Sequence, residues 1–396
     1  MRGVAEVFVP AAVWASPFRP FYLLGSLYGL VLVTAWVGAL HGLWRVPSGD
    51  VPLHLWHGHE MLFGFAAAII VGIVLTALPS WAGTPEIRGI RLALLVILWL
   101  AGRIAYWAGA WLPAPWPVVF DLLLFPAVFV MVTPQLLRAS NRLYLLLLPI
   151  LFALFAANFV HHVAASGANL PVAGAALRGA LYAIIVLYVL KGGVLTPIFT
   201  GNALREKGRG DQAPFDMRLE IVCMGALLLL ATLDLAGAPS LLTGIAALAC
   251  ALAHGWRVAR WKGWLLVDVP MVFVMHLGFA WLVFAFALKA AAELTGLVPE
   301  SAWVHAFTLG SLGMMMLGLM MRVSLRHTGR PLVVPRVMLV ACVTMFFSAL
   351  VRLAATVHEL GDFVIVLAAF LWAISFALYF IRFATTLLTP SLRRGG

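Results

Sequence analysis

The chain has 396 residues, of which 64% are hydrophobic and only 10% charged, and its formal net charge is +11. A soluble protein of this length needs far more charge to cover its surface, and the alternating pattern of a transmembrane β-barrel is absent from the sequence. The composition therefore predicts an all-α, polytopic membrane protein.

Apolar runs long enough to cross a bilayer core of ~30 Å recur along the whole chain. The connections between them are short and carry Pro, Gly or charges, and the longest polar segment is Gly201–Asp216. We therefore expect a single transmembrane domain over residues 1–396. Its twelve spans are expected at 21–41, 59–79, 90–111, 117–134, 143–162, 176–200, 217–236, 238–256, 268–292, 302–325, 335–357 and 363–388.

The basic residues predict the orientation. With the N-terminus in the cytoplasm, 20 of the 26 Lys and Arg residues fall in inner segments, and the outer loops hold only Arg45. Positive residues concentrate on the cytoplasmic side of membrane proteins, so both termini are predicted to be inside. The excess of basic residues is then explained by membrane topology and requires no nucleic-acid partner.

Five basic residues remain in or at the ends of expected spans: Arg103, Arg178, Lys191, Lys289 and Arg352. A charge at mid-helix costs at least ~2.5–3.5 kcal/mol, so such residues usually have partners or functions. Arg178, Lys289 and Arg352 lie near the outer ends and are candidates for cofactor binding. The alternative is that their long side chains snorkel to the outer interface.

The second and tenth expected spans share five identities at an offset of 246. Both run from outside to inside, begin with a His and end in a Gly-x-Pro turn. Because the two spans lie eight positions apart in the order of helices, the offset favours a pseudo-repeat of four helices. The paired residues are His59 and His305, Gly64 and Gly310, Gly72 and Gly318, Gly83 and Gly329, and Pro85 and Pro331.

Histidines carry the main chemical signal. Eight of the eleven fall at or near the outer ends of spans: His41, His54, His57, His59, His161, His162, His305 and His358. Neutral imidazole is a common ligand of Fe, Cu and Zn, so this layer predicts a metal or haem site. The candidate metal ligands are His54, His57, His59, His161, His162, His276 and His305.

The segment 54–61 (HLWHGHEM) is the densest part of this layer. On a helix, His54 and His57 share a face, whereas His59 is rotated by about 200° from His57. The three histidines therefore suit two adjacent sites better than one. Glu60 is a candidate proton relay or further ligand. The alternative is an interfacial belt of His and Trp that caps a helix start.

His59 and His305 begin equivalent spans at similar depth, so facing helices would present them to one haem iron from both sides. The alternative for His305 is a helix-end residue hydrogen-bonded to the backbone. His276 lies among apolar residues in the ninth span, where an ionisable group is a functional candidate. His161 and His162 are adjacent, and the sequence leaves open which of them is a ligand.

Four segments resemble a known family, in order along the chain: 57–65 (HGHEMLFGF), 195–202 (LTPIFTGN), 276–281 (HLGFAW) and 305–332, which ends in MRVSLRHTGRPL. They are similar to the NnrS family of multi-pass proteins of the bacterial inner (plasma) membrane. The resemblance implies a twelve-helix protein that carries haem b and copper and protects cells against nitric oxide. The residues that match recurrent positions are His57, His59, Glu60, His276, His305 and His327.

One departure from the family pattern is Val194, where the family tends to have Arg; Lys191 is the candidate substitute. The architecture is also similar to the core subunit of haem-copper oxidases and nitric oxide reductases, whose second and tenth helices supply both axial ligands of the low-spin haem. That likeness assigns His59 and His305 to this role. Because this chain has no His-x-His in span ten and no His in span six, a binuclear centre would need His54, His57 and His161 or His162, with His276.

The preferred hypothesis is a haem- and copper-binding protein that binds or reduces nitric oxide near the periplasmic side, as a nitric oxide reductase-like oxidoreductase surrounded by membrane lipid. Reduction requires an external electron donor, a quinol or a periplasmic carrier, because the chain has no CxxCH, Rossmann glycine pattern or iron–sulfur cysteine set. One alternative is a secondary transporter, for which Lys191 and Pro197 in span six fit a broken helix. Another is a nitric oxide sensor or scavenger without turnover.

Overall fold

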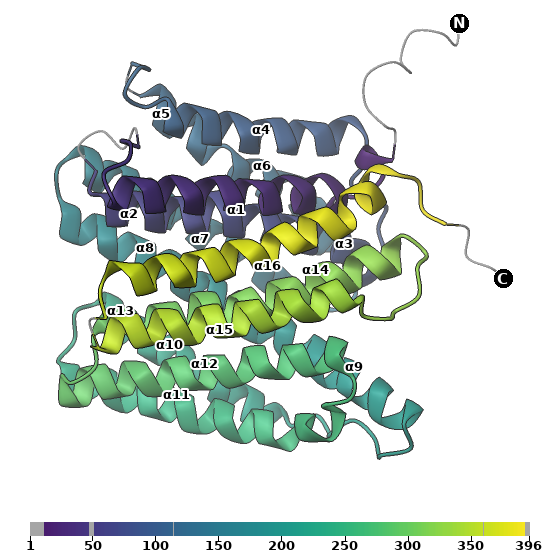
Figure 1. The fold of residues 1–396 in the computed structure, drawn as a ribbon. Coiled ribbons are helices and arrows are strands. Elements are labelled where there is room, and N and C mark those ends of the chain that lie inside the picture. Colours follow the sequence, from purple (N-terminus) through teal and green to yellow (C-terminus); the bar gives the residue numbers. More distant parts are fainter. Residues whose placement is uncertain (1–11, 47–50, 114, 359, 393–396) are drawn as a thin grey trace, which may run out of the picture. The chain divides into compact units, whose positions relative to one another are not determined.

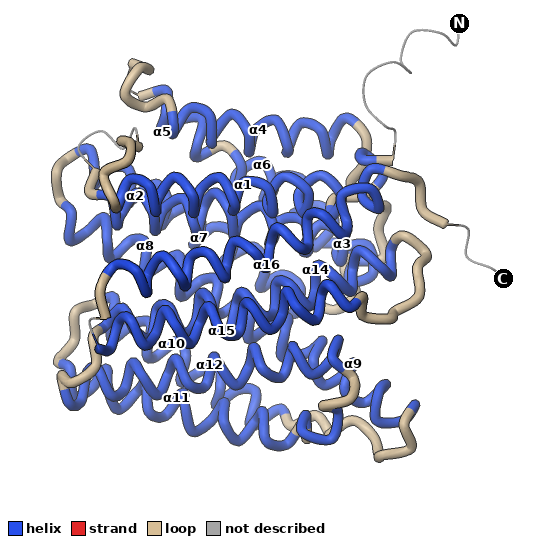
Figure 2. Tube along the Cα trace, in the orientation of Figure 1, coloured by secondary structure: helices blue, strands red, loops and turns tan. Residues whose placement is uncertain are grey.

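The computed structural model describes residues 12–46, 51–113, 115–358 and 360–392 (Figure 1). Every regular element in these ranges is helical (Figure 2). The α-helices are α1 (Phe18–Leu40), α2 (Leu53–His59), α3 (Ala67–Ala82), α4 (Ile90–Trp107), α5 (Trp116–Leu122), α6 (Leu124–Arg138), α7 (Leu147–Ser166), α8 (Leu170–Leu187), α9 (Gly193–Glu206), α10 (Met217–Leu235), α11 (Ser240–Arg260), α12 (Pro270–Thr295), α13 (Glu300–His305), α14 (Met314–His327), α15 (Arg336–His358) and α16 (Asp362–Leu388).

Within the described ranges, eleven helices are long and apolar enough to cross a membrane, several of them continuous runs of two or three elements. The chain is therefore an all-helical, multi-pass membrane protein. The seventh expected span is also helical, as α10, but Arg218, Glu220 and Asp234 make it too charged to be among the eleven. Twelve spans and the inside position of both termini remain predictions.

The helices that contain the second and tenth expected spans begin before the histidines that were expected to start them. The helix of the second expected span covers Leu53–Ala82, and Pro52, with extended backbone, immediately precedes it. The helix of the tenth expected span covers Glu300–His327. Proline cannot donate the backbone hydrogen bond that continues a helix toward its N-terminus, so Pro52 sets the earlier start. His59 and His305 consequently lie inside their helices.

Three of the long helices contain a π-helical segment: η2 (Glu60–Ala66), η4 (Tyr188–Gly192) and η6 (Ala306–Gly313). Three helical spans separate each of these helices from the next one. Segments η2 and η6 begin directly after His59 and His305, which keeps the offset of 246 seen in the sequence. The recurrence in every fourth helix agrees with the expected four-helix repeat. Such segments are rare and often occur at functional sites.

Each π-helical segment also contains a glycine on which an aromatic ring packs. A Cβ atom at these glycines would approach the ring to between 2.3 and 3.3 Å, so any larger residue would displace it. Glycine at helix contacts lets neighbouring elements come close in membranes. The pairs are Gly64 with Tyr28, Gly192 with Phe279, and Gly310 with Trp281.

The described residues fall into two compact units. Unit 1 is formed from the segments Met1–Ala183, Met320–Leu332 and Phe376–Gly396. Unit 2 is formed from the segments Ile184–Leu319 and Val333–Ser375. In unit 1, α1 packs along α3 and α6 along α7; in unit 2, α10 and α12 both pack along α11 (Figure 1). His59, His161 and His162 belong to unit 1, whereas His276 and His305 belong to unit 2.

Candidate metal centre

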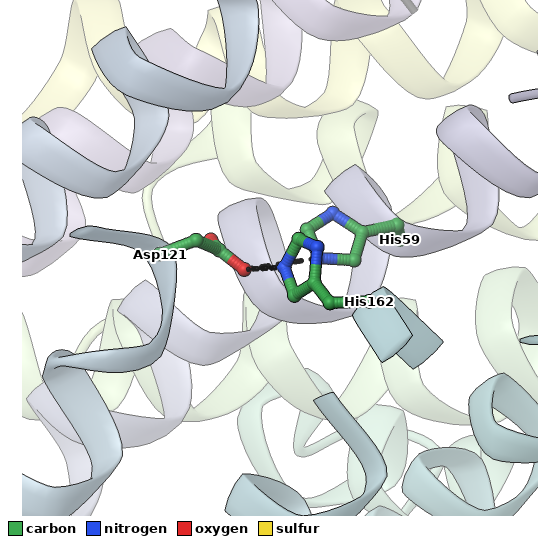
Figure 3. Close-up of side chains that lie close together, drawn as sticks. All are labelled: His59, Asp121 and His162. Carbon is green, nitrogen blue, oxygen red and sulfur yellow. Dashed lines mark hydrogen bonds and ion pairs between the residues drawn. The ribbon is translucent and has the colours of Figure 1, made fainter. Parts of the chain in front are cut away.

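Unit 1 brings His59, Asp121 and His162 together from three helices (Figure 3). His59 ends α2, Asp121 lies in α5 and His162 in α7, and all three side chains are buried. Oδ2 of Asp121 is 3.1 Å from Nε2 of His59 and 2.7 Å from Nε2 of His162. The three ligand atoms all lie within 4.8 Å of one another.

Local sequence explains how Asp121 reaches this position. Helix α5 has a proline in its first turn, Pro117, where its missing N–H costs no hydrogen bond. Helix α4 approaches α5 closely at Gly102, where a Cβ atom would lie only 3.1 Å from Cα of Asp121. The close approach brings Asp121 next to Arg103, the residue that follows Gly102.

Arg103 joins the two carboxylates of the site. Its guanidinium forms ion pairs with Glu60 and with Oδ1 of Asp121, and all three groups are buried. Two carboxylates thus face one guanidinium, which leaves one negative charge when the imidazoles are neutral. Burying an uncompensated charge is costly, so the cluster favours a further positive charge, either a proton or a metal ion.

A second set of polar groups orients the cluster. Nδ2 of Asn158 donates to Oδ2 of Asp121 at 2.8 Å, and Oδ1 of Asn158 lies 2.9 Å from Nε2 of His59. Tyr28 donates a hydrogen bond to Glu60, and Nε1 of Trp107 lies 3.2 Å from Oε2 of the same carboxylate. Ligands held in this way keep the orientation that a metal requires.

The hydrogen bonds of a neutral His59 do not balance. Its Nδ1 is 3.0 Å from Oε1 of Glu60, and its Nε2 faces the oxygens of Asp121 and Asn158. A neutral imidazole has only one N–H, so one of its nitrogens faces oxygen acceptors with no proton between them. A second ring proton or a metal ion at Nε2 resolves this conflict. With a metal ion, Glu60 accepts the Nδ1 proton, as carboxylates often do for metal-bound histidines.

His161 and His162 have different surroundings. Nδ1 of His161 donates to the carbonyl of Ala173 at 3.1 Å, and its ring centroid is 5.0 Å from that of His59. Among the described residues, Nε2 of His161 has no hydrogen-bond partner. Of these two histidines, His162 is the one within hydrogen-bond distance of Asp121 among the described residues. The cluster therefore contains His162, and His161 lies beside it.

The other expected residues of the segment 54–61 lie outside the cluster. His54 is exposed, and the partly buried ring of His57 stacks on Trp36 with centroids 4.3 Å apart. Glu60 is buried and contacts His59 and Arg103, as described above. The rotation about the helix axis expected from the sequence thus separates His59 from the two histidines before it.

In unit 2, His276 and His305 have separate environments. Nε2 of the buried His276 lies 2.8 Å from Oγ1 of Thr200. Nδ1 of His305 lies 2.7 Å from the carbonyl oxygen of Ser301, one turn earlier in α13. This second arrangement fixes Nε2 of His305 as the nitrogen that would face a metal.

The three basic residues near the expected outer ends also differ. Arg178 is partly buried in α8, and the Arg352 guanidinium donates to Oγ1 of Thr356 at 2.5 Å within α15. Lys289 is buried and forms ion pairs with three carboxylates rather than snorkelling. These partners are Asp234 at 2.6 Å, Glu293 at 2.7 Å and Glu300 at 3.5 Å.

We expect Lys289→Met to lower the free energy of unfolding by about 3–5 kcal/mol, because removing one partner of a buried ion pair leaves the others uncompensated. Thermal unfolding in detergent measures the effect. Lys207→Met is the matched control, since the Lys207–Asp268 pair is exposed and such pairs contribute only about 0–1 kcal/mol. Equal losses in the two variants would contradict the prediction.

Sequence reasoning missed Asp121, Arg103 and Asn158 as members of the site. Asp121 is the only charged residue between Pro117 and Pro134, and Arg103 lies in the span before it. Two isolated, opposite charges in consecutive membrane helices each require a partner. Arg103 and Asp121 are each other's partner in the structure. That pairing was the signal available in the sequence. Nothing in the sequence distinguished the amide of Asn158.

Comparison with protein families matches residues 12–391 to the family model described as NnrS protein. The match includes every residue of the candidate metal centre. No curated protein matches the chain.

Proposed function

The chain belongs to the NnrS family, and we propose that it is a metal-containing protein of the nitric oxide response in the bacterial inner membrane. In this proposal it binds or reduces nitric oxide at the cluster of His59, Asp121 and His162. The observation that carries the proposal is that Nε2 of buried His59 faces two oxygen atoms, Oδ2 of Asp121 and Oδ1 of Asn158, in a cluster with two carboxylates and one guanidinium.

Two imidazoles and one carboxylate suit an iron, copper or zinc ion. Such an ion binds nitrogen and oxygen ligands at about 2.0–2.2 Å, so two ligand atoms at right or tetrahedral angles lie roughly 3 Å apart. The separations of 3.1 and 2.7 Å from Asp121 Oδ2 to the two Nε2 atoms approach this value. We propose copper or non-haem iron, because both exchange electrons and zinc does not.

Haem b is proposed at a different histidine. The ring of His59 stacks on Tyr106 with centroids 4.2 Å apart, and its Nε2 faces the cluster, so it suits a directly coordinated ion better than a haem. His305 has the Nδ1 bond to a backbone carbonyl that is common for metal-bound imidazoles. We therefore propose His305 as an axial ligand of haem b in unit 2.

A redox metal supplies an electron and an open coordination position for a small neutral ligand such as nitric oxide. The residues of this chain prepare the position. Glu60 holds the Nδ1 proton of His59, Arg103 holds both carboxylates in place through its two ion pairs, and Asn158 positions the Asp121 oxygen. Electrons would come from an external quinol or periplasmic carrier, with membrane lipid around the helices.

The test uses full-length protein purified in detergent after expression with iron, copper and haem available. We expect about one non-haem metal ion per chain by elemental analysis, and a change in the optical or paramagnetic spectrum on adding nitric oxide. His59→Ala should remove that metal. His54→Ala is the matched control, because His54 is exposed on the same helix and should leave metal content unchanged.

Two results would overturn the proposal: wild-type protein without bound metal under these conditions, or equal metal content in His59→Ala and wild type. Nitrous oxide formation by reduced protein then separates reduction from binding. Metal binding with no nitrous oxide supports a scavenger or sensor.

A further inference from the structure

A row of buried hydroxyl groups follows one side of the long helix Leu170–Glu206, in the part of that helix that belongs to unit 2. Thr200, Thr196 and Tyr188 form the row. Twelve residues of helix span about 18 Å, more than half of a bilayer core of ~30 Å. The row faces α12, because Thr200 contacts His276 of α12 and the ring of Tyr188 lies 4.8 Å from that of Phe279 of α12.

Two polar atoms at the Thr196–Thr200 end of this row have no hydrogen-bond partner among the described residues. They are Oγ1 of Thr196 and Nδ1 of His276; at the other end, the Tyr188 hydroxyl and the Ser311 side chain are close enough to interact with each other. Leaving one such buried group unsatisfied costs about 1–3 kcal/mol. The two together therefore indicate that water completes their hydrogen bonds, as it does in most polar interiors.

The hydrogen bond between Thr200 and His276 shows that Nδ1 of His276 needs a hydrogen-bond donor. The Thr200 hydroxyl donates to the carbonyl of Thr196 at 2.7 Å. Its single proton is thereby used, so Nε2–H of His276 must donate to Oγ1 of Thr200 at 2.8 Å. Nδ1 of His276 is then an acceptor without a donor, and a water molecule can supply the proton.

The end of the row at Tyr188 lies between two π-helical segments. Tyr188 begins η4 and Ser311 lies in η6. A Cβ atom on Gly278 of α12 would lie 2.9 Å from the Tyr188 hydroxyl and 3.1 Å from the carbonyl oxygen of Ser311. Both polar groups therefore converge on a helix position with no side chain.

The end of the row at Thr196 and Thr200 adjoins a cleft of about 30 Å³. A water molecule needs roughly 10–15 Å³ of such space, so the cleft has room for two. The backbone amide of Leu219 and the Arg260 guanidinium lower the pKa of Asp216, which keeps one wall of the cleft charged. The lining includes Gly193, Pro197, Asp216, Arg257, Arg260 and Trp261.

Two aromatic rings pack along the row beside this cleft. Trp261 lines the cleft, and its ring centroid is 6.1 Å from that of His276 and 4.8 Å from that of Phe279. Phe279 also packs against Gly192, between Thr196 and Tyr188, where a Cβ atom would lie 3.3 Å from its ring. Phe279 therefore narrows the row between Thr196 and Tyr188.

We propose that water molecules occupy this row and that it relays protons between the cleft and the π-helical segments η4 and η6. Each hydroxyl or water accepts a proton on its oxygen and releases another to the next acceptor, so only O–H and N–H bonds form and break. No electron is transferred and no net charge remains in the row. The inference is independent of the metal cluster, because all the residues involved belong to unit 2.

Hydroxyl-radical labelling of the full-length protein in ¹⁸O-water tests for the water. We expect Tyr188 to be labelled at least about threefold more than Tyr379. Tyr379 is the matched control, because it is buried and its hydroxyl is hydrogen-bonded to Ser324 at 2.8 Å. Labelling of Tyr188 at or below the level of Tyr379 would overturn the proposal.

Deuterium exchange of the Tyr188 hydroxyl, followed by infrared spectroscopy, tests the proton relay. Tyr188→Phe identifies the band. We expect Thr196→Val to slow the exchange at least tenfold, Thr196→Ser to retain it and Phe279→Ala to accelerate it. Thr232→Val is the control, since Thr232 is exposed on α10. Exchange in Thr196→Val as fast as in wild type would refute the relay, even if water is detected.

Discussion

Arg103→Leu is expected to destabilise the protein by about 3–5 kcal/mol, since it leaves Glu60 and Asp121 as buried carboxylates without their shared cation. The same change should make the protein depend more strongly on bound metal. A ligand present at 100 times its dissociation constant stabilises by about 2.7 kcal/mol. Thermal unfolding in detergent, with chelator and with added metal, measures both effects.

Two variants control this experiment. Arg91→Leu removes an exposed arginine from the same helix, α4, and should change stability by less than about 0.5 kcal/mol. Arg103→Leu combined with Glu60→Gln removes one of the two carboxylates and should recover part of the loss. If Arg103→Leu is as stable as wild type in the presence of chelator, the two ion pairs do not hold the cluster together.

His162→Ala is expected to weaken metal binding by more than about 100-fold, whereas the neighbouring His161→Ala should weaken it by about 10-fold or less. The loss of a direct ligand costs more than the 10–100-fold typical of an orienting partner. The difference follows from geometry: Nε2 of His162 is 2.7 Å from the Asp121 carboxylate, whereas His161 is hydrogen-bonded to the backbone of Ala173. Competition with a chromophoric chelator gives both affinities.

Asp121→Asn provides the complementary variant in this series. It keeps the size of the side chain but removes its charge, and we expect it to weaken binding as strongly as His162→Ala. Because the two histidines are adjacent in one helix, a difference between them cannot arise from general unfolding of α7. Equal affinities in His161→Ala and His162→Ala would contradict the proposed ligand set.

The sequence predicted the membrane class, the family and most of the helices, because each depends on local composition or motif. The expected seventh span shows the limit of that approach. Its apolar centre predicts a membrane crossing. The charged residues near its ends, Arg218, Glu220 and Asp234, make α10 too polar to count among the eleven candidate membrane-spanning helices. Hydropathy alone does not decide such a helix.

The candidate site could be predicted only in part. His59 and the pair His161 and His162 were expected because histidine in an apolar span is unusual, but the sequence left open which of the pair is a ligand. Glu60 was expected from its place in the His-rich segment 54–61, and the calculated rotation separated His57 from His59. Asp121 enters the site through the close approach of α4 and α5 at Gly102. That approach is a property of packing between helices, which periodicity within one helix does not reveal.

The internal repeat was informative about architecture but less so about ligands. It relates the π-helical segments that follow His59 and His305. Equivalent position does not imply equivalent chemistry, however. Glu60 follows His59, whereas Ala306 follows His305, so the two copies offer different partners to their histidines.

The ion pair between Arg103 and Asp121 also bears on how the chain is inserted during synthesis. At a helix centre, each of these charges opposes entry into lipid by about 2.5–3.5 kcal/mol on the scale measured for the translocon. Helices α4 and α5 are consecutive, so the two charges emerge from the ribosome close together in time. Neutralised by each other, they can leave the translocon as one helical hairpin. The buried charge of the candidate metal centre is thus compatible with biogenesis because Arg103 and Asp121 arrive as neighbours, after the helix that carries Glu60, the second carboxylate paired with Arg103.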